Sequence, residues 1–174
     1  MDLKPVSLGM KSKSMKNSSS PHLIEARERI RINGTPLSYK QFHQYFFDVF
    51  GKQISTEMTY FVALTIMAFH VFLKEKVDVV VLETGIGGRF DTTNIIPNTS
   101  LCVITLIDYD HMNILGSSLE EISWNKAGII KNHSKVITIQ QNETVLNILD
   151  QESRDKSAKL KIIDLHENDG KIFR

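Results

Sequence analysis

The chain has 174 residues, of which 41% are hydrophobic and 24% are charged, and its formal net charge at pH 7 is +1. These values are typical of a folded globular protein, and the near-neutral charge gives no reason to expect nucleic acid or a membrane as a partner. The single cysteine excludes an intrachain disulfide and a cysteine metal cluster, and it fits an intracellular setting.

Residues 1–18 differ in composition from the rest of the chain. They contain four lysines, several serines and one acidic residue, without helical or strand periodicity. We therefore expect a disordered basic tail, followed by a folded domain at 19–174. A mitochondrial presequence is also basic and rich in serine, but this segment lacks arginine and an apolar face. The expected location is cytoplasmic, and a mitochondrial location is considered in addition to it.

Two helices are predicted in the first half of the chain. Ser38 and Gln41 have the spacing of a capping box, and the segment 38–50 places apolar residues on one side of a helix. This stripe consists of Phe42, Tyr45, Phe46, Val49 and Phe50. Residues 58–76 are apolar almost all round, which predicts a second, deeply packed helix.

Strands and helices alternate in the second half. Residues 77–82 and 101–107 are β-branched runs without polar alternation, which is typical of strands covered on both faces. A capping-box pair, Ser117 and Glu120, predicts the start of a helix. The remaining elements are helices at 117–130 and 143–156 and strands at 135–139 and 160–164. This order predicts an α/β fold with a parallel sheet, flanking helices and right-handed crossovers.

Polar residues follow two of the predicted strands directly. Glu83 comes after the first run, and Asp108, Asp110 and His111 come after the second. Because ligands of open parallel sheets bind at the carboxyl ends of the strands, we expect these groups to lie on one rim. Each residue alone is more easily explained by a structural role, which is capping for Glu83 and a turn for His111. Because both follow strand ends, a site and a structural role are evenly matched at this point.

The glycine cluster at 85–88 is not a phosphate-binding loop of the usual kind. Such a loop has the pattern G-x-x-x-x-G-K-[ST], and neither Gly51-Lys52 nor Gly170-Lys171 is followed by serine or threonine. The cluster also lacks the third glycine of a dinucleotide fingerprint. Its predicted role is a sharp backbone turn beside Glu83.

Four motifs together resemble the folylpolyglutamate synthases, which are Mur-ligase-like, ATP-dependent, amide-forming ligases. The motifs are "SSPHLIEARERIRING", "VDVVVLETGIGGRFDTTN", "DYDHMNILG" and "NKAGIIK". The resemblance extends from Ser19 to Lys131, and the stretch "AFHVFLKEKVD" is more similar to the animal enzymes than to the bacterial ones. It implies the family's central ATPase domain.

The resemblance also implies an activity and its limits. Family members phosphorylate the terminal carboxylate of a reduced folate with ATP and then join glutamate to it. Their partners would be folate polyglutamate, L-glutamate and ATP, and we expect a monomer. Family members also carry a phosphate loop and a C-terminal domain that these 174 residues lack, so we expect a fragment that is inactive and poorly soluble alone. Alternatives are dihydrofolate synthase activity, or a non-catalytic remnant that binds folate or a partner.

Individual site residues are also implied by the resemblance. Ser20, Glu83 and His111 match the positions that gather around a Mg²⁺ ion in the family, although histidine is an atypical ligand of magnesium. Lys126 matches a lysine that is commonly carbamylated by carbon dioxide. This modification requires a neutral amine, whereas an unperturbed lysine titrates near ~10.4. Without the motif, a solvated lysine on a helix would be the default interpretation.

Four further residues in the motifs have less specific expectations. Arg27 and Arg29 could bind the anionic folate tail, but an ordinary surface charge is an equally good interpretation. Asp91 and Asn94 also match the family pattern, and their residue types favour fixing the loop over doing chemistry.

Overall fold

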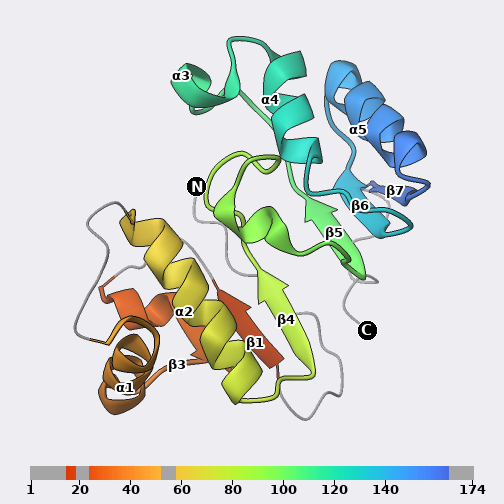
Figure 1. Ribbon diagram of the computed structural model, residues 1–174. Coiled ribbons are helices and arrows are strands. Elements are labelled where there is room, and N and C mark those ends of the chain that lie inside the picture. Colours follow the sequence, from red (N-terminus) through yellow and green to blue (C-terminus); the bar gives the residue numbers. More distant parts are fainter. Residues whose placement is uncertain (1–14, 19–23, 52–57, 165–174) are drawn as a thin grey trace. The chain divides into compact units, whose positions relative to one another are not determined.

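The computed structural model of the chain describes residues 15–18, 24–51 and 58–164 (Figure 1). The chain divides into two compact units, Met1–Gly85 and Ile86–Arg174. Among the described residues, no helix has the length and apolar character needed to cross a membrane. Most of the predicted basic tail and Ser20 lie outside the described residues.

The first unit contains a four-stranded mixed sheet. Its strands are β1 (Met15–Ser18), β2 (Ile30–Ile32), β3 (Thr35–Pro36) and β4 (Val79–Leu82), in the order β3-β2-β1-β4. β1 runs parallel to β4 and antiparallel to β2. The prediction of a disordered tail is therefore wrong for residues 15–18. Backbone pairing on both sides makes this strand, and a local sequence pattern does not reveal such pairing.

The two helices predicted in the first half of the chain are present in this unit. They are α1 (Tyr39–Phe50) and α2 (Tyr60–Lys74), which pack against each other (Figure 1). The capping box is confirmed, because the Ser38 side chain accepts from the Gln41 backbone N–H and the Gln41 side chain accepts from that of Ser38. The predicted apolar stripe of α1 packs against a core formed mainly by α2. Helix α2 is not covered all round, since Leu73 is exposed.

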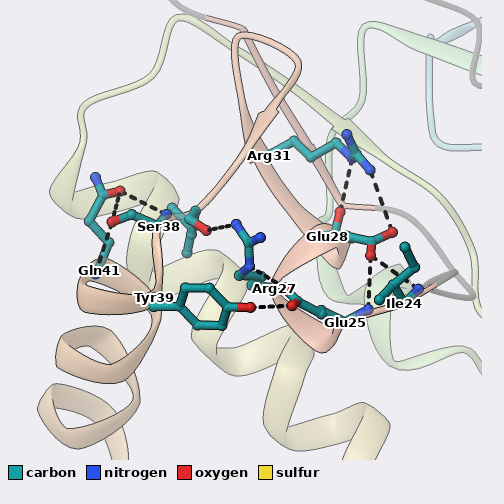
Figure 2. A network of polar contacts seen from close by, with 9 residues as sticks. Ile24, Glu25, Arg27, Glu28, Arg31, Ser38, Tyr39 and Gln41 are labelled. Carbon is teal, nitrogen blue, oxygen red and sulfur yellow. Dashed lines mark hydrogen bonds and ion pairs between the residues drawn. The ribbon is translucent and has the colours of Figure 1, made fainter.

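A polar network joins the start of β2 to the start of α1 (Figure 2). The Glu25 carboxylate accepts hydrogen bonds from the Tyr39 hydroxyl and from Arg27. Arg27 also donates from Nη1 to the Leu37 carbonyl at 3.0 Å. The bonds from Tyr39 and Arg27 lower the pKa of Glu25. Arg27 thus has a carboxylate partner within its own unit, which favours the structural interpretation of its charge.

The second unit contains a three-stranded parallel sheet with flanking helices. The strands are β5 (Leu101–Ile104), β6 (Lys135–Ile139) and β7 (Lys159–Ile163), in the order β5-β6-β7. The helices of this unit are η2 (Thr92–Ile95), α3 (Met112–Leu115), α4 (Leu119–Ala127) and α5 (Glu143–Asp155). The first unit also contains a short 3-10 helix, η1 (Ala26–Arg29). The α/β class with a parallel sheet is confirmed.

The core of this unit lies between the sheet and helices α4 and α5. It consists of Cys102, Ile104, Ile107, Leu115, Ile122, Ala127, Ile130, Val136, Val145 and Leu149. β5 ends three residues earlier than predicted, where the Gln141 side chain accepts from the Ile107 backbone N–H at 2.8 Å. Val103 is exposed whereas Cys102 and Ile104 are buried. The prediction that this strand is covered on both faces is therefore wrong for β5.

The start of α4 differs from the prediction by one residue. The N-cap is Ser118, whose side chain accepts from the Glu121 backbone N–H at 3.2 Å, rather than Ser117 with Glu120. The Glu121 carboxylate also accepts from the backbone N–H groups of Ser117 and Ser118, at 2.7 and 3.3 Å. Both serines are followed by a glutamate three positions later, so the sequence pattern fits either register.

Ser118→Ala is therefore expected to lower the free energy of unfolding by about 1 kcal/mol, because it removes the acceptor for an otherwise unpaired helical N–H. Ser117→Ala is expected to cost less than half as much, since its backbone N–H keeps the bond to Glu121. Urea unfolding of the purified chain measures both values. Equal losses, or a larger loss in Ser117→Ala, would contradict the observed register.

Candidate functional site

Gly87 and Gly88 of the glycine cluster lie against the last turn of helix α4. Gly87 has a φ of +65°, and a Cβ atom added there would be 2.6 Å from the Asn125 side-chain oxygen. A Cβ at Gly88 would be 2.8 Å from the Lys126 carbonyl oxygen. Only glycine combines the left-handed backbone with so close an approach. These two glycines therefore have a structural role, as expected for the cluster, and helix α4 is the element that they approach.

The segment after the glycines is held by its own side chains. The buried Asp91 carboxylate accepts from the Ile86 backbone N–H at 2.9 Å and from the backbone and side chain of Thr93 at 2.9 and 2.6 Å. The Asn94 side-chain nitrogen donates to the carbonyls of Arg89 and Gly128, both at 3.1 Å. The prediction that Asp91 and Asn94 fix the loop is confirmed.

Asp91→Ala is expected to lower the free energy of unfolding of the second unit by about 2 kcal/mol. Asp91 is only 8% exposed, and its loss leaves the N–H groups of Ile86 and Thr93 without their acceptor. Urea unfolding followed by the fluorescence of Trp124 measures the change. Asp108→Ala is the matched control, since among the described residues that exposed carboxylate accepts only from the adjacent Tyr109 N–H. Equal losses in the two variants would contradict the role of Asp91.

Lys126 lies in the last turn of α4, directly beside this loop. The carbonyl of the preceding Asn125 accepts from the backbone N–H of Arg89 at 2.7 Å. Lys131, which lies beyond the end of α4, also contacts this loop, since its amine donates to the Asn94 carbonyl at 3.1 Å. Burial lowers the pKa of Lys131. The Lys126 side chain is partly exposed, and its amine makes no hydrogen bond within the described residues.

His111 lies at the N-terminus of α3 in an unusual backbone conformation. Its φ of 50° falls in the left-handed region, which is uncommon for a residue with a side chain. The neighbouring Asp110 carboxylate accepts from the His111 backbone N–H at 2.7 Å and lies 3.5 Å from the His111 Nε2 atom. The imidazole is half exposed. Strain of this kind often marks a functional position.

The predicted metal ligands are placed to different degrees. Glu83 directly follows β4 in the first unit, as predicted, and His111 belongs to the second unit. That Glu83 and His111 share a Mg²⁺ site stays a prediction, and so does the role of Ser20 as a third ligand. Among the described residues, no three histidine, cysteine, aspartate or glutamate side chains are grouped closely enough to hold a metal ion. The donor chemistry nevertheless fits in part, because carboxylate and hydroxyl oxygens suit Mg²⁺.

Arg89 directly follows the glycine cluster, and its sequence context indicates no role for it. In the structure its side chain reaches both α4 and α5, contacting the Trp124 carbonyl and the Glu152 carboxylate. These partners are 35 and 63 positions away in the sequence. No local pattern could indicate them.

Comparison with known proteins gives a consistent result. No family model matches the chain. The mitochondrial folylpolyglutamate synthase of Bos taurus is 43% identical over 150 residues, which is 82% of this chain and 25% of that protein. The probable folylpolyglutamate synthase of Schizosaccharomyces pombe is 38% identical over 83% of this chain and 30% of its own length.

Solved structures share the fold as well. A folylpolyglutamate synthase described as a complex with AMPPCP and folate has a TM-score of 0.78 and 26% identity, over 86% of this chain and 38% of its own. The Mycobacterium tuberculosis synthase, complexed with ADP and AMPPCP, has a TM-score of 0.77 and 34% identity, over 86% of this chain and 36% of its own.

The fold therefore places the chain in a class of ligases whose solved members include nucleotide complexes. More narrowly, the chain belongs to the folylpolyglutamate synthase family. It spans about a quarter of the length of the first animal relatives, at 25% of the Bos taurus and Homo sapiens proteins.

Proposed function

We propose that the chain is a segment of a ligase that adds glutamate to the γ-carboxylate of tetrahydrofolate polyglutamates. The observation that carries this proposal is the 43% identity to an animal folylpolyglutamate synthase over 82% of the chain. That the solved relatives include an AMPPCP–folate complex supports both ATP and folate as substrates. The names of the Bos taurus and Homo sapiens relatives include the word mitochondrial, which supports a mitochondrial location of the protein in addition to the expected cytoplasmic one.

The proposed reaction has two steps. The terminal folate carboxylate attacks the γ-phosphorus of ATP, so that an acyl phosphate forms and ADP leaves. The amine of the incoming glutamate then attacks the acyl carbon, a C–N bond forms, and inorganic phosphate and a proton are released. Ser20, Glu83 and His111 are the proposed ligands of Mg²⁺. When bound there, the ion supplies neutralisation of the phosphate charge.

Lys126 is proposed to act as a carbamate. Its neutral amine forms a C–N bond with carbon dioxide, and the nitrogen loses one proton, which leaves a carbamate anion on the side chain. The side chain in the last turn of α4 would then carry a negative charge and two oxygen atoms that can accept hydrogen bonds or bind a metal ion. Lys126 is partly exposed and its amine makes no hydrogen bond within the described residues, which supports this role.

A chimeric enzyme tests the proposal without depending on where the chain begins or ends. Residues 19–164 would replace the matching segment of the human mitochondrial synthase, which supplies every other part. The chimera is expected to incorporate glutamate into tetrahydrofolate with ATP, and Glu83→Gln is expected to abolish this. Glu143→Gln, which changes an exposed residue at the start of α5, is the control.

The other outcomes separate the alternatives. Turnover of dihydropteroate but not of tetrahydrofolate would indicate a dihydrofolate synthase. A folded chimera that turns over neither substrate would favour a non-catalytic remnant. The 174 residues alone are expected to be inactive, because they contain no G-x-x-x-x-G-K-[ST] sequence to cradle the phosphates of ATP.

A further inference from the structure

The Arg89 side chain joins three elements of the second unit. Its Nη2 atom donates to a Glu152 carboxylate oxygen on α5 at 2.7 Å, and Nε and Nη2 lie 3.3 and 3.1 Å from the Trp124 carbonyl on α4. The guanidinium carbon also lies 4.0 Å from the centre of the Trp124 ring. One side chain from the glycine loop therefore reaches both helices.

These contacts differ from an ordinary surface ion pair. The Arg89 and Glu152 side chains are only 22% and 12% exposed, whereas those of Arg154 and Asp150, paired along α5, are 74% and 46% exposed. A planar guanidinium can donate to two acceptors and stack on an aromatic ring at once, which a lysine cannot do. Its cation also complements the carbonyl end of helix α4. The Arg89 contacts are therefore expected to contribute more to the free energy of unfolding than the exposed Arg154–Asp150 pair does.

The main chain of Arg89 attaches to the same turn of α4. Its N–H donates to the Asn125 carbonyl at 2.7 Å, and its carbonyl accepts from the Asn94 side chain at 3.1 Å. Lys126 immediately follows Asn125, and its own carbonyl lies against Gly88. Arg89 thus holds, through main chain and side chain together, the two residues that precede Lys126.

We propose that Arg89 is a positioning residue, which locks the loop 86–94 onto the last turn of α4 and thereby fixes the orientation of Lys126. The proposal rests on the proposed function in one respect only, namely that Lys126 carries the carbamate. In Arg89→Ala, the Trp124 carbonyl and the Glu152 carboxylate lose their donor. The loop and the Lys126 turn then become free to separate.

Carbamate occupancy tests the proposal by a readout other than activity. The 174-residue chain would be purified behind a tryptophan-free carrier domain and equilibrated with ¹³C-bicarbonate, and the carbamate carbon would be detected by NMR. The signal is expected in the unmodified chain and absent in Lys126→Ala. Arg89→Ala is expected to lower it about tenfold, as is typical for coupled residues in contact. Arg154→Ala, the matched control, is expected to leave it unchanged.

Global unfolding would also remove the signal, so each variant is compared where its far-UV circular dichroism equals that of the unmodified chain. Glu152→Gln is the milder variant, since it keeps both bonds to the Trp124 carbonyl, and an intermediate loss is expected. It decides the question if Arg89→Ala does not fold. Full carbamate occupancy in a folded Arg89→Ala, or in Glu152→Gln if only that variant folds, would overturn the proposal.

A second readout separates failure of this proposal from failure of the proposed function. If the unmodified chain carries no carbamate on Lys126, the chemistry proposed for that residue fails. Trp124, the only tryptophan, then still reports whether Arg89 holds the loop. Arg89→Ala is expected to shift its emission to longer wavelength and to increase quenching by acrylamide, and Arg154→Ala to do neither. Emission and quenching unchanged in Arg89→Ala would overturn the positioning role directly.

Discussion

Gly128→Ala is expected to lower the free energy of unfolding of the second unit by about 3 kcal/mol. A Cβ atom at this position would lie 2.3 Å from the Cβ and 2.5 Å from the Cα of Arg89. Because one of these is a backbone atom, no side-chain rotation relieves the overlap. The whole loop would have to move away from α4, and the hydrogen bonds of Arg89 and Asn94 to this turn would be lost with it.

Urea unfolding followed by Trp124 fluorescence measures this loss. Gly34→Ala is the control, since a Cβ there meets nothing within 4 Å although φ is +81°. Gly34→Ala is expected to lower the free energy of unfolding only by the backbone strain of about 1 to 2 kcal/mol. Because Gly34 lies in the first unit and Trp124 in the second, the unfolding of this variant is followed by circular dichroism. A loss in Gly128→Ala of less than 1 kcal/mol would mean that the loop does not rest on α4 as observed.

Lys126→Ala in the chimeric enzyme is expected to reduce turnover about 10³-fold, the loss typical of removing one preorganised charged contact to the transition state. The free energy of unfolding is expected to change by no more than about 0.5 kcal/mol, because the side chain is partly exposed. Glutamate incorporation and urea unfolding would be measured on the same preparation.

Lys135→Ala serves as the control, because it removes an exposed lysine from the start of β6. Added formate or bicarbonate is expected to restore part of the activity of Lys126→Ala, since a small carboxylate can occupy the space of the carbamate. Turnover that is unchanged in Lys126→Ala would remove this residue from the site.

Periodicity and capping patterns predicted most of the regular structure because the forces behind them are local. The stripe of α1 packs on the core as expected, and Ser38 caps that helix because no neighbouring residue competes for the role. At α4 two adjacent serines fit the same pattern, and the backbone selects Ser118, which adopts the extended conformation of an N-cap. Local rules therefore predict that a cap exists more reliably than they predict its register.

The features that sequence could not predict depend on distant partners. Strand β1 has no strand periodicity and exists through pairing with β2 and β4. Arg89 acquires its role from Trp124 and Glu152, which are remote in sequence. The loop-fixing role of Asp91, in contrast, was predictable, because its acceptor bonds are made within five residues.

The left-handed backbone of His111 has a consequence for engineering this protein. Asparagine and glycine adopt this φ of 50° more readily than histidine does, so substitution by either should relieve local strain. A variant library selected for thermal resistance alone would therefore be expected to discard the imidazole at this position early. If His111 is a Mg²⁺ ligand as proposed, selection that retains it would have to reward catalysis in every round, because backbone strain alone favours other residues there.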